Sequence, residues 1–296
     1  MNVYAAISAN IWKTNILLAL FIIFAGTLGY FIGEVSGYGP PLGYGILIAA
    51  MIYGFISFFF SDKVVLSSTG SKEIVKEDHP ELFRIVENLA LGNGMPMPKI
   101  YIIQDPAPNA FATGRDPKHA SVSVTTGILN LLDKAELEGV IAHELSHIKN
   151  YDTRIMALTA VLIGSIITLS DVFMRTYFWG RGNRNAGGPA GLMVVAFLLA
   201  IATPLASLMQ LAISRKREFL ADASGVLLTR YPEGLATALE KISADPNQLS
   251  KASHGNAHLF IANPFKDAEK KSRNWINGLF STHPPAEERI KILRSM

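Results

Sequence analysis

The chain of 296 residues has no cysteine and few charged side chains. Without cysteine there are no disulfides and no thiolate metal sites, so a metal ion would have to be held by imidazole and carboxylate groups. Charged residues make up 17% of the chain and hydrophobic residues 49%, and the mean hydropathy is +0.27. These values favour a membrane protein over a soluble one.

Neither a phosphate-binding loop of the form G-x-x-x-x-G-K-[ST] nor a strong charge imbalance is present. The net charge is only +3, and the basic residues cluster beside apolar segments rather than among aromatic residues. This arrangement of basic residues favours contact with a membrane surface over nucleic-acid binding. Because the phosphate-binding loop is missing, we do not expect this chain to use a nucleotide as an energy source.

Four apolar runs are long enough to be considered as membrane spans. Ile16 to Ile32 and Leu42 to Phe60 each approach the ~20 residues that cross a bilayer. A cleaved signal peptide is the alternative for the first run, but no convincing small-residue cleavage site precedes Glu34. Ile155 to Met174 and Leu192 to Ile213 follow later, and the alternative for the former is a helix buried in the protein or shallow in the membrane.

The decapeptide "IAHELSHIKN", residues 141 to 150, contains the candidate catalytic and metal-binding residues. In a helix, His143, Glu144 and His147 fall within an arc of roughly 100°, so two imidazoles and one carboxylate can meet at one point. Asp133 and Glu136 form a capping box that predicts the start of this helix. The H-E-x-x-H spacing predicts a zinc site with Glu144 as general base; the alternative is a structural helix that carries the motif by chance.

A catalytic zinc takes three protein ligands and leaves one position open. In "RKREFLADAS", Glu218 and Asp222 are four residues apart and share a helix face. Glu218 could be the third ligand, while Asp222 could accept a hydrogen bond from a ligand histidine. The alternative is a solvated helix whose acids offset Arg215 and Arg217.

These motifs resemble the HtpX family of bacterial membrane zinc metallopeptidases. The similarity rests on "HELSH", "REFLAD", "NAFATG" at Asn109 to Gly114 and "STHPPAEERI" at Ser281 to Ile290, in the same order and spacing over nearly the whole chain. The motifs are also similar to those of the wider gluzincin group, which includes the CAAX prenyl endopeptidase. The resemblance implies one Zn²⁺ per chain and peptide-bond hydrolysis at the cytosolic face of the bacterial inner membrane, in membrane protein quality control and the stress response.

The resemblance also implies roles for individual residues. It makes His143, His147 and Glu218 the zinc ligands, Glu144 the general base, Asp222 the acid behind a ligand, Asn109, Ala110 and Phe111 the strand that binds substrate, and His283 the group facing the scissile carbonyl. Taken without the resemblance, Asn109 is a turn residue beside Pro108 and His283 a helix-entry residue before Pro284. The implied partners are misfolded membrane proteins or unfolded proteins, the lipid bilayer and other quality-control proteases, with no nucleic acid.

The expected fold is an α+β integral membrane protein with about four transmembrane helices and a mainly helical, zincin-like protease domain that bears a small sheet. A helix at Pro80 to Leu91 and strands at Lys99 to Gln104 and Ser121 to Thr125 are predicted within that domain. The predicted sections are an N-terminal membrane hairpin (1–62), a first catalytic part (63–153), a second hairpin (154–213) and a second catalytic part (214–296).

Basic residues beside the runs predict a cytosolic catalytic domain. They are Lys63, Lys149, Arg154, Arg215, Lys216 and Arg217. Arg175, Arg181 and Arg184, in the loop between the third and fourth runs, do not fit this rule. The competing function is a non-enzymatic membrane-binding or channel-forming protein whose histidine helix is structural.

Four other histidines are not expected to bind metal. His254 and His258 are also four apart, but the intervening Gly255 and Asn256 disfavour a helix. His79 precedes a helix, and His119 lies in a loop.

Overall fold

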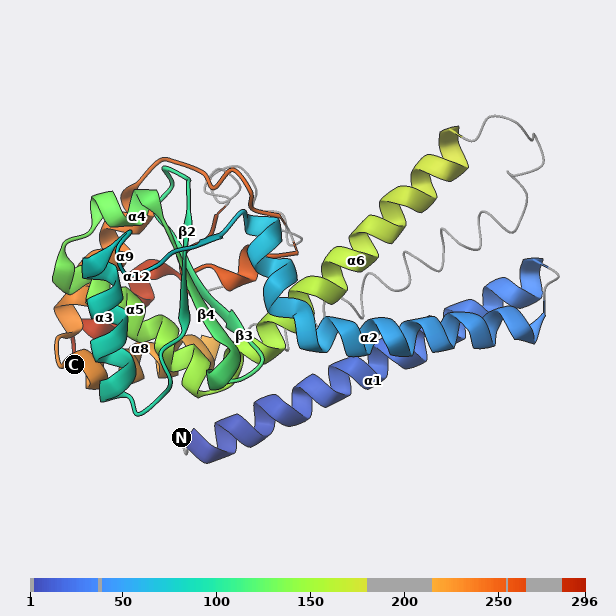
Figure 1. The fold of residues 1–296 in the computed structure, drawn as a ribbon, viewed down its shortest axis with the longest axis horizontal. Helices are drawn as coiled ribbons and strands as arrows, with labels where there is room; N and C mark the ends of the chain where they lie inside the picture. The colour runs from blue at the N-terminus through green and yellow to red at the C-terminus, as the bar shows by residue number, and fades with distance from the viewer. Residues whose placement is uncertain (1–2, 37–38, 180–214, 254, 265–283) are drawn as a thin grey trace.

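The computed structural model describes all residues except 1–2, 37–38, 180–214, 254 and 265–283. Its described part has a mostly helical body around a four-stranded sheet, and three long helices, α1, α2 and α6, extend away from that body (Figure 1). This agrees with the expected α+β class.

Helices α1 (Val3–Ser36) and α2 (Pro40–Thr69) form a long antiparallel pair (Figure 1). They pack closely because Gly43 has no side chain: a Cβ there would lie 2.8 Å from the Cα of Tyr30. Within them, Ile7–Thr27 and Gly43–Thr69 are long and apolar enough to cross a membrane. The first candidate span begins nine residues before the predicted one, because the helix already includes the polar residues that precede Ile16.

Helix α6 (Asp152–Trp179) contains the third predicted run. Its residues 155–163 are all buried, and several of them share one apolar cluster with Leu17 of α1 and Val65 and Leu66 of α2. Among the described helices only α1 and α2 qualify as candidate spans. The predicted fourth run lies outside the described residues, so a count of four spans remains a prediction.

The sheet has the strand order β1-β2-β4-β3. Its strands are β1 (Lys72–Glu73), β2 (Lys99–Ile103), β3 (Ala110–Gly114) and β4 (Ala120–Thr125). β2 and β4 are parallel, with Ile102 opposite Val124, whereas β3 runs antiparallel to β4 and forms an edge. The strands predicted near residues 99 and 121 are therefore confirmed.

Helices pack around this sheet and bury its apolar residues (Figure 1). They are α3 (Pro80–Gly92), α4 (Thr126–Leu131), α5 (Lys134–Lys149), α8 (Arg215–Thr229), α9 (Pro232–Ala244) and α12 (Ala286–Leu293), with 3-10 turns η1 (Pro117–His119) and η2 (Ala257–Leu259). The predicted helix at 80–91 is confirmed. The expected section boundaries at 62 and 153 fall inside α2 and α6, so two continuous helices cross them.

Candidate active site

Helix α5 places the H-E-x-x-H residues in the interior of the body. The capping box between Asp133 and Glu136 is present, and His143, Glu144 and His147 are all buried. After the helix ends at Asn150, Tyr151 adopts a positive φ of 59°. This left-handed residue turns the chain sharply, so that Asp152 at the start of α6 comes back against His147.

Helix α8 crosses α5 at short distance and brings in the third acid. Gly225 permits the close approach, since a Cβ at that position would lie 3.1 Å from the backbone nitrogen of His143. Glu218 and Asp222 are both buried on the face of α8 that meets α5. They share a helix face, as predicted, and their burial excludes the alternative of a solvated acidic helix; their roles as ligand and as the acid behind a ligand stay predictions.

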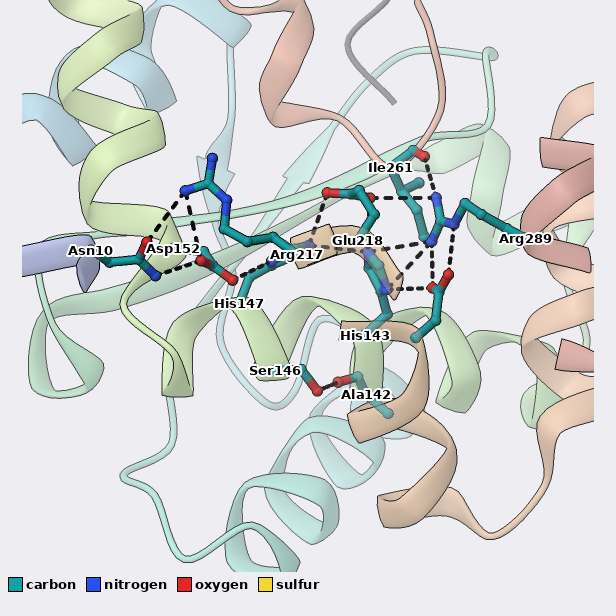
Figure 2. A network of polar contacts seen from close by, with 11 residues as sticks. Asn10, Ala142, His143, Ser146, His147, Asp152, Arg217, Glu218, Ile261 and Arg289 are labelled. Carbon is teal, nitrogen blue, oxygen red and sulfur yellow. Dashed lines mark hydrogen bonds and ion pairs between the residues drawn. The ribbon is translucent and has the colours of Figure 1, made fainter. Parts of the chain in front are cut away.

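Three donor atoms converge between α5 and α8. The Nε2 atoms of His143 and His147 are 3.1 Å apart, and they lie 3.7 and 3.5 Å from the two carboxylate oxygens of Glu218 (Figure 2). Ligands bonded to a tetrahedral zinc at about 2.0–2.2 Å are separated from each other by about 3.3–3.6 Å. The observed separations of 3.1, 3.5 and 3.7 Å lie close to this range, so the three side chains could hold a metal ion.

The hydrogen bonds behind the two rings fix which nitrogen faces the cluster. Nδ1 of His143 is 2.9 Å from a carboxylate oxygen of Asp222, and Nδ1 of His147 is 3.0 Å from one of Asp152. Because a carboxylate accepts the Nδ1 proton, each Nε2 presents a lone pair to the cluster. When both imidazoles are neutral, two Nε2 lone pairs and the Glu218 carboxylate face one buried space, which is a set of groups that can ligate a metal ion.

Arg289 of α12 contacts both acidic residues of α8, Asp222 and Glu218. Its guanidinium donates to both oxygens of Asp222, at 2.6 and 2.9 Å, and lies 3.6 Å from Glu218 (Figure 2). Burial alone would raise the pKa of Asp222, but Arg289 and His143 lower it to about 2. Asp222 is therefore ionised whenever it holds the His143 ring.

The same surroundings set the protonation of the histidines and of Glu144. Burial and the charge of Arg289 lower the pKa of His143 to about 4. Burial would also lower the pKa of His147, but its bond to Asp152 and the nearby Glu218 carboxylate raise it to about 9. Burial raises the pKa of Glu144 to about 7, against a hydrogen bond from the backbone of Ala112. A carboxylate poised near neutral pH is suited to general base catalysis.

These pKa values predict that metal binding strengthens with pH. In protein stripped of metal, His147 should carry a proton below pH 9, and a ligand imidazole must be neutral, so one proton leaves for each ion bound. His143 is already neutral above pH 5 and adds nothing. The dissociation constant for zinc, measured by chelator competition, should fall by about tenfold per pH unit between pH 7 and 8.5. A dissociation constant that is constant over this interval would contradict the assignment of His147.

The predicted substrate-binding residues lie at the edge strand beside the cluster. Ala110 and Phe111 are in β3, and Asn109 directly precedes it. The Asn109 amide donates to the carbonyl of Ala262 at 3.1 Å, and Ile261 N–H donates to the carbonyl of Ala110 at 2.9 Å. Asn109 therefore helps to hold the segment that contains Ile261 and Ala262 against the start of β3. The sequence did not suggest this role.

Other histidines stay away from the cluster. His79 caps α3 by accepting from Leu82 N–H, His119 pairs with Asp116, and His258 lies in η2, 3.0 Å from the carbonyl of Met156. This agrees with their exclusion as ligands. His254 and His283 lie outside the described residues, so the expected place of His283 near the scissile bond stays a prediction.

Sequence reasoning missed two polar residues that support the site. Asp152 has no assigned role in the sequence analysis, and Asn10 precedes the predicted apolar run Ile16 to Ile32. Arg217 was assigned to a basic cluster at the membrane face, yet it is buried and lies 3.8 Å from Asp152. The end of the helix at Asn150 was the sequence feature that could have indicated a turn bringing Asp152 back toward the motif.

Comparison with known proteins identifies relatives over the full length. Residues 76–296 match the model of peptidase family M48. The protease HtpX homologue of Tropheryma whipplei (strain Twist) is 43% identical over 99% of this chain and 98% of its own length. That of Dictyoglomus thermophilum is 44% identical over 99% and 94%.

The fold is also similar to that of a solved structure. S. mikatae Ste24p superposes with a TM-score of 0.53 at 19% identity, covering 95% of this chain and 66% of that protein.

Proposed function

The chain belongs to peptidase family M48 and is a metalloendopeptidase of the HtpX type, and we propose that it is a membrane-embedded zinc endopeptidase whose metal ligands are His143, His147 and Glu218. The observation that carries this proposal is the convergence of two imidazole nitrogens and one carboxylate in a buried space, each ring held from behind by an acid. A structural or channel-forming role gives no reason for such a set of donors, and it is not favoured.

The chain's own groups can carry out the proton transfers of peptide hydrolysis. A bound zinc ion supplies a Lewis acid that polarises the scissile carbonyl and makes a water molecule more acidic. Glu144 takes the proton of the attacking water and passes it to the leaving amine. In the metal-free protein burial raises the pKa of Glu144 to about 7, so its carboxyl binds a proton more readily than an exposed glutamate does.

The substrate is proposed to lie as an added strand along β3, the strand of Asn109, Ala110 and Phe111. An edge strand can pair with an added peptide, but the Ala110 carbonyl already accepts from Ile261 N–H, so a substrate would have to displace that segment there. The Ala112 N–H that bonds the Glu144 carboxylate belongs to the same edge. The strand and the general base are therefore neighbours. His283 is proposed to donate a hydrogen bond to the oxygen of the scissile carbonyl as negative charge develops on it.

The cellular setting follows from the family and the candidate spans. We propose that misfolded or damaged membrane proteins are cleaved at the cytosolic face of the bacterial inner membrane, with sections 1–62 and 154–213 as membrane hairpins and 63–153 and 214–296 as the catalytic domain. The two spans in α1 and α2 support membrane attachment. Membrane quality control under stress is the corresponding role.

The proposed function is tested with purified protein in detergent. Zinc-loaded protein should cleave casein, used as an unfolded substrate, and a chelator should stop the reaction until zinc is restored. Cleavage that continues in metal-free protein would contradict the proposal. Absence of cleavage by protein shown to contain one zinc per chain would favour the competing binding or channel function.

The proposed orientation gives a separate prediction. Single cysteines at Ser67, exposed near the end of α2, and at Gly187, outside the described residues, can be labelled because the chain has no other cysteine. In whole cells an impermeant thiol reagent should label Gly187→Cys and not Ser67→Cys. The opposite pattern would mean that the catalytic domain faces outward or that the later runs do not span.

A further inference from the structure

A polar side chain of the first candidate span is buried against the protein. Asn10 lies in the first turns of Ile7–Thr27 and is 3% exposed, although Trp12, two residues on, is 68% exposed. A polar side chain in a membrane helix is costly unless protein groups satisfy it, and such residues commonly serve function.

Asn10 uses both hydrogens of its amide on the junction between α5 and α6. Nδ2 donates to the carbonyl of Asn150 at 2.9 Å and to one oxygen of Asp152 at 2.7 Å (Figure 2). The other oxygen of Asp152 is the one that lies 3.0 Å from Nδ1 of His147. A continuous chain of hydrogen bonds therefore joins the membrane helix α1 to a proposed zinc ligand.

The amide oxygen of Asn10 faces Arg217. Nη1 of Arg217 donates to the amide oxygen of Asn10 at 3.5 Å and lies 3.8 Å from the Asp152 oxygen that Asn10 binds. Asn10 thus stands between a cation and the carboxylate that holds His147. Without its amide, Asp152 could turn toward Arg217, and the His147 ring would lose the acceptor that fixes its tautomer.

We propose that Asn10 is a positioning residue for the metal site: by fixing Asp152 it orients His147, so that the packing of α1 against the junction between α5 and α6 contributes to zinc affinity. This inference rests on the ligand set of the proposed function. On this proposal, α1 helps to position a zinc ligand in addition to attaching the protein to the membrane.

The test measures zinc affinity of the full-length protein in detergent by chelator competition. Asn10→Leu keeps the branched shape and the number of heavy atoms of the side chain and removes its hydrogen bonds. Groups behind a ligand typically change metal affinity by about 10–100-fold, and Asn10 acts one bond farther away, so about tenfold weaker binding is expected. Thr14→Val is the matched control, because Thr14 is also buried in α1 but donates only to the backbone carbonyl of Asn10.

Two further measurements separate positioning from general packing. The visible absorption of cobalt-substituted protein should change in Asn10→Leu and not in Thr14→Val, because it reports the geometry of the ligands. Asp152→Asn should weaken zinc binding, and the double variant Asn10→Leu/Asp152→Asn should be no weaker than Asp152→Asn alone, since both act through His147.

Wild-type zinc affinity and cobalt absorption in Asn10→Leu, or fully additive losses in the double variant, would overturn the proposal. If Asn10→Leu does not fold, the same measurements are made on Asn10→Ala, and the same results would support or overturn the proposal. A wild-type protein that binds no zinc would instead refute the proposed function, so the two failures are distinguishable.

Discussion

Glu218→Ala is expected to lose zinc, and its peptidase activity should fall in proportion to the metal that remains. Glu218 supplies the carboxylate that lies 3.5 and 3.7 Å from the two imidazole nitrogens. Groups behind a ligand are worth about 10–100-fold in metal affinity, and removal of a ligand itself should exceed that range. Metal analysis by mass spectrometry, on protein purified without added zinc, measures the loss.

The matched control is Glu138→Ala, which removes a half-exposed glutamate of α5 whose partner is Lys134. It should keep one zinc per chain. A Glu218→Ala protein that is zinc-replete and active would show that the third ligand lies elsewhere.

Glu144→Gln should give the opposite combination, with zinc retained and turnover lost. The amide keeps the size of the side chain, but it cannot accept the proton of the attacking water. Loss of a general base commonly costs about 10²–10⁴ in rate. The variant should therefore bind zinc as tightly as wild type and lose at least two orders of magnitude in kcat for a peptide substrate.

Self-cleavage provides a second readout for this variant. Protein that is folded and zinc-loaded but lacks the base should stay intact during purification, whereas the wild type should degrade its own unfolded copies. Wild-type turnover by Glu144→Gln would remove Glu144 from the mechanism, and loss of zinc from it would make Glu144 a ligand.

The local parts of the fold were readable from sequence because they depend on short spacings. The capping box at Asp133 and Glu136, the convergence of His143 with His147 and the buried face of Glu218 and Asp222 all follow from helical periodicity, and the structure contains them. The strands β2 and β4 follow likewise from alternating residues.

Contacts between residues that are far apart in the chain could not be predicted from the sequence. Most of the side chains that hold the ligand histidines in place make contacts of this kind. In one continuous helix Asp152 would point about 140° away from His147; the left-handed Tyr151 breaks the helix and brings them together. Asn10 and Arg217 are separated by 207 positions, so no local pattern joins them. Arg289 likewise donates to Asp222 across 67 positions of the chain.

The central claim is that His143, His147 and Glu218 together bind the catalytic zinc. Anomalous diffraction from crystals of the zinc-loaded protein, recorded at the zinc absorption edge, tests it most directly. We expect one peak per chain, within about 2.0–2.2 Å of Nε2 of His143, Nε2 of His147 and a carboxylate oxygen of Glu218. A peak coordinated by other residues, with none between these three, would contradict it.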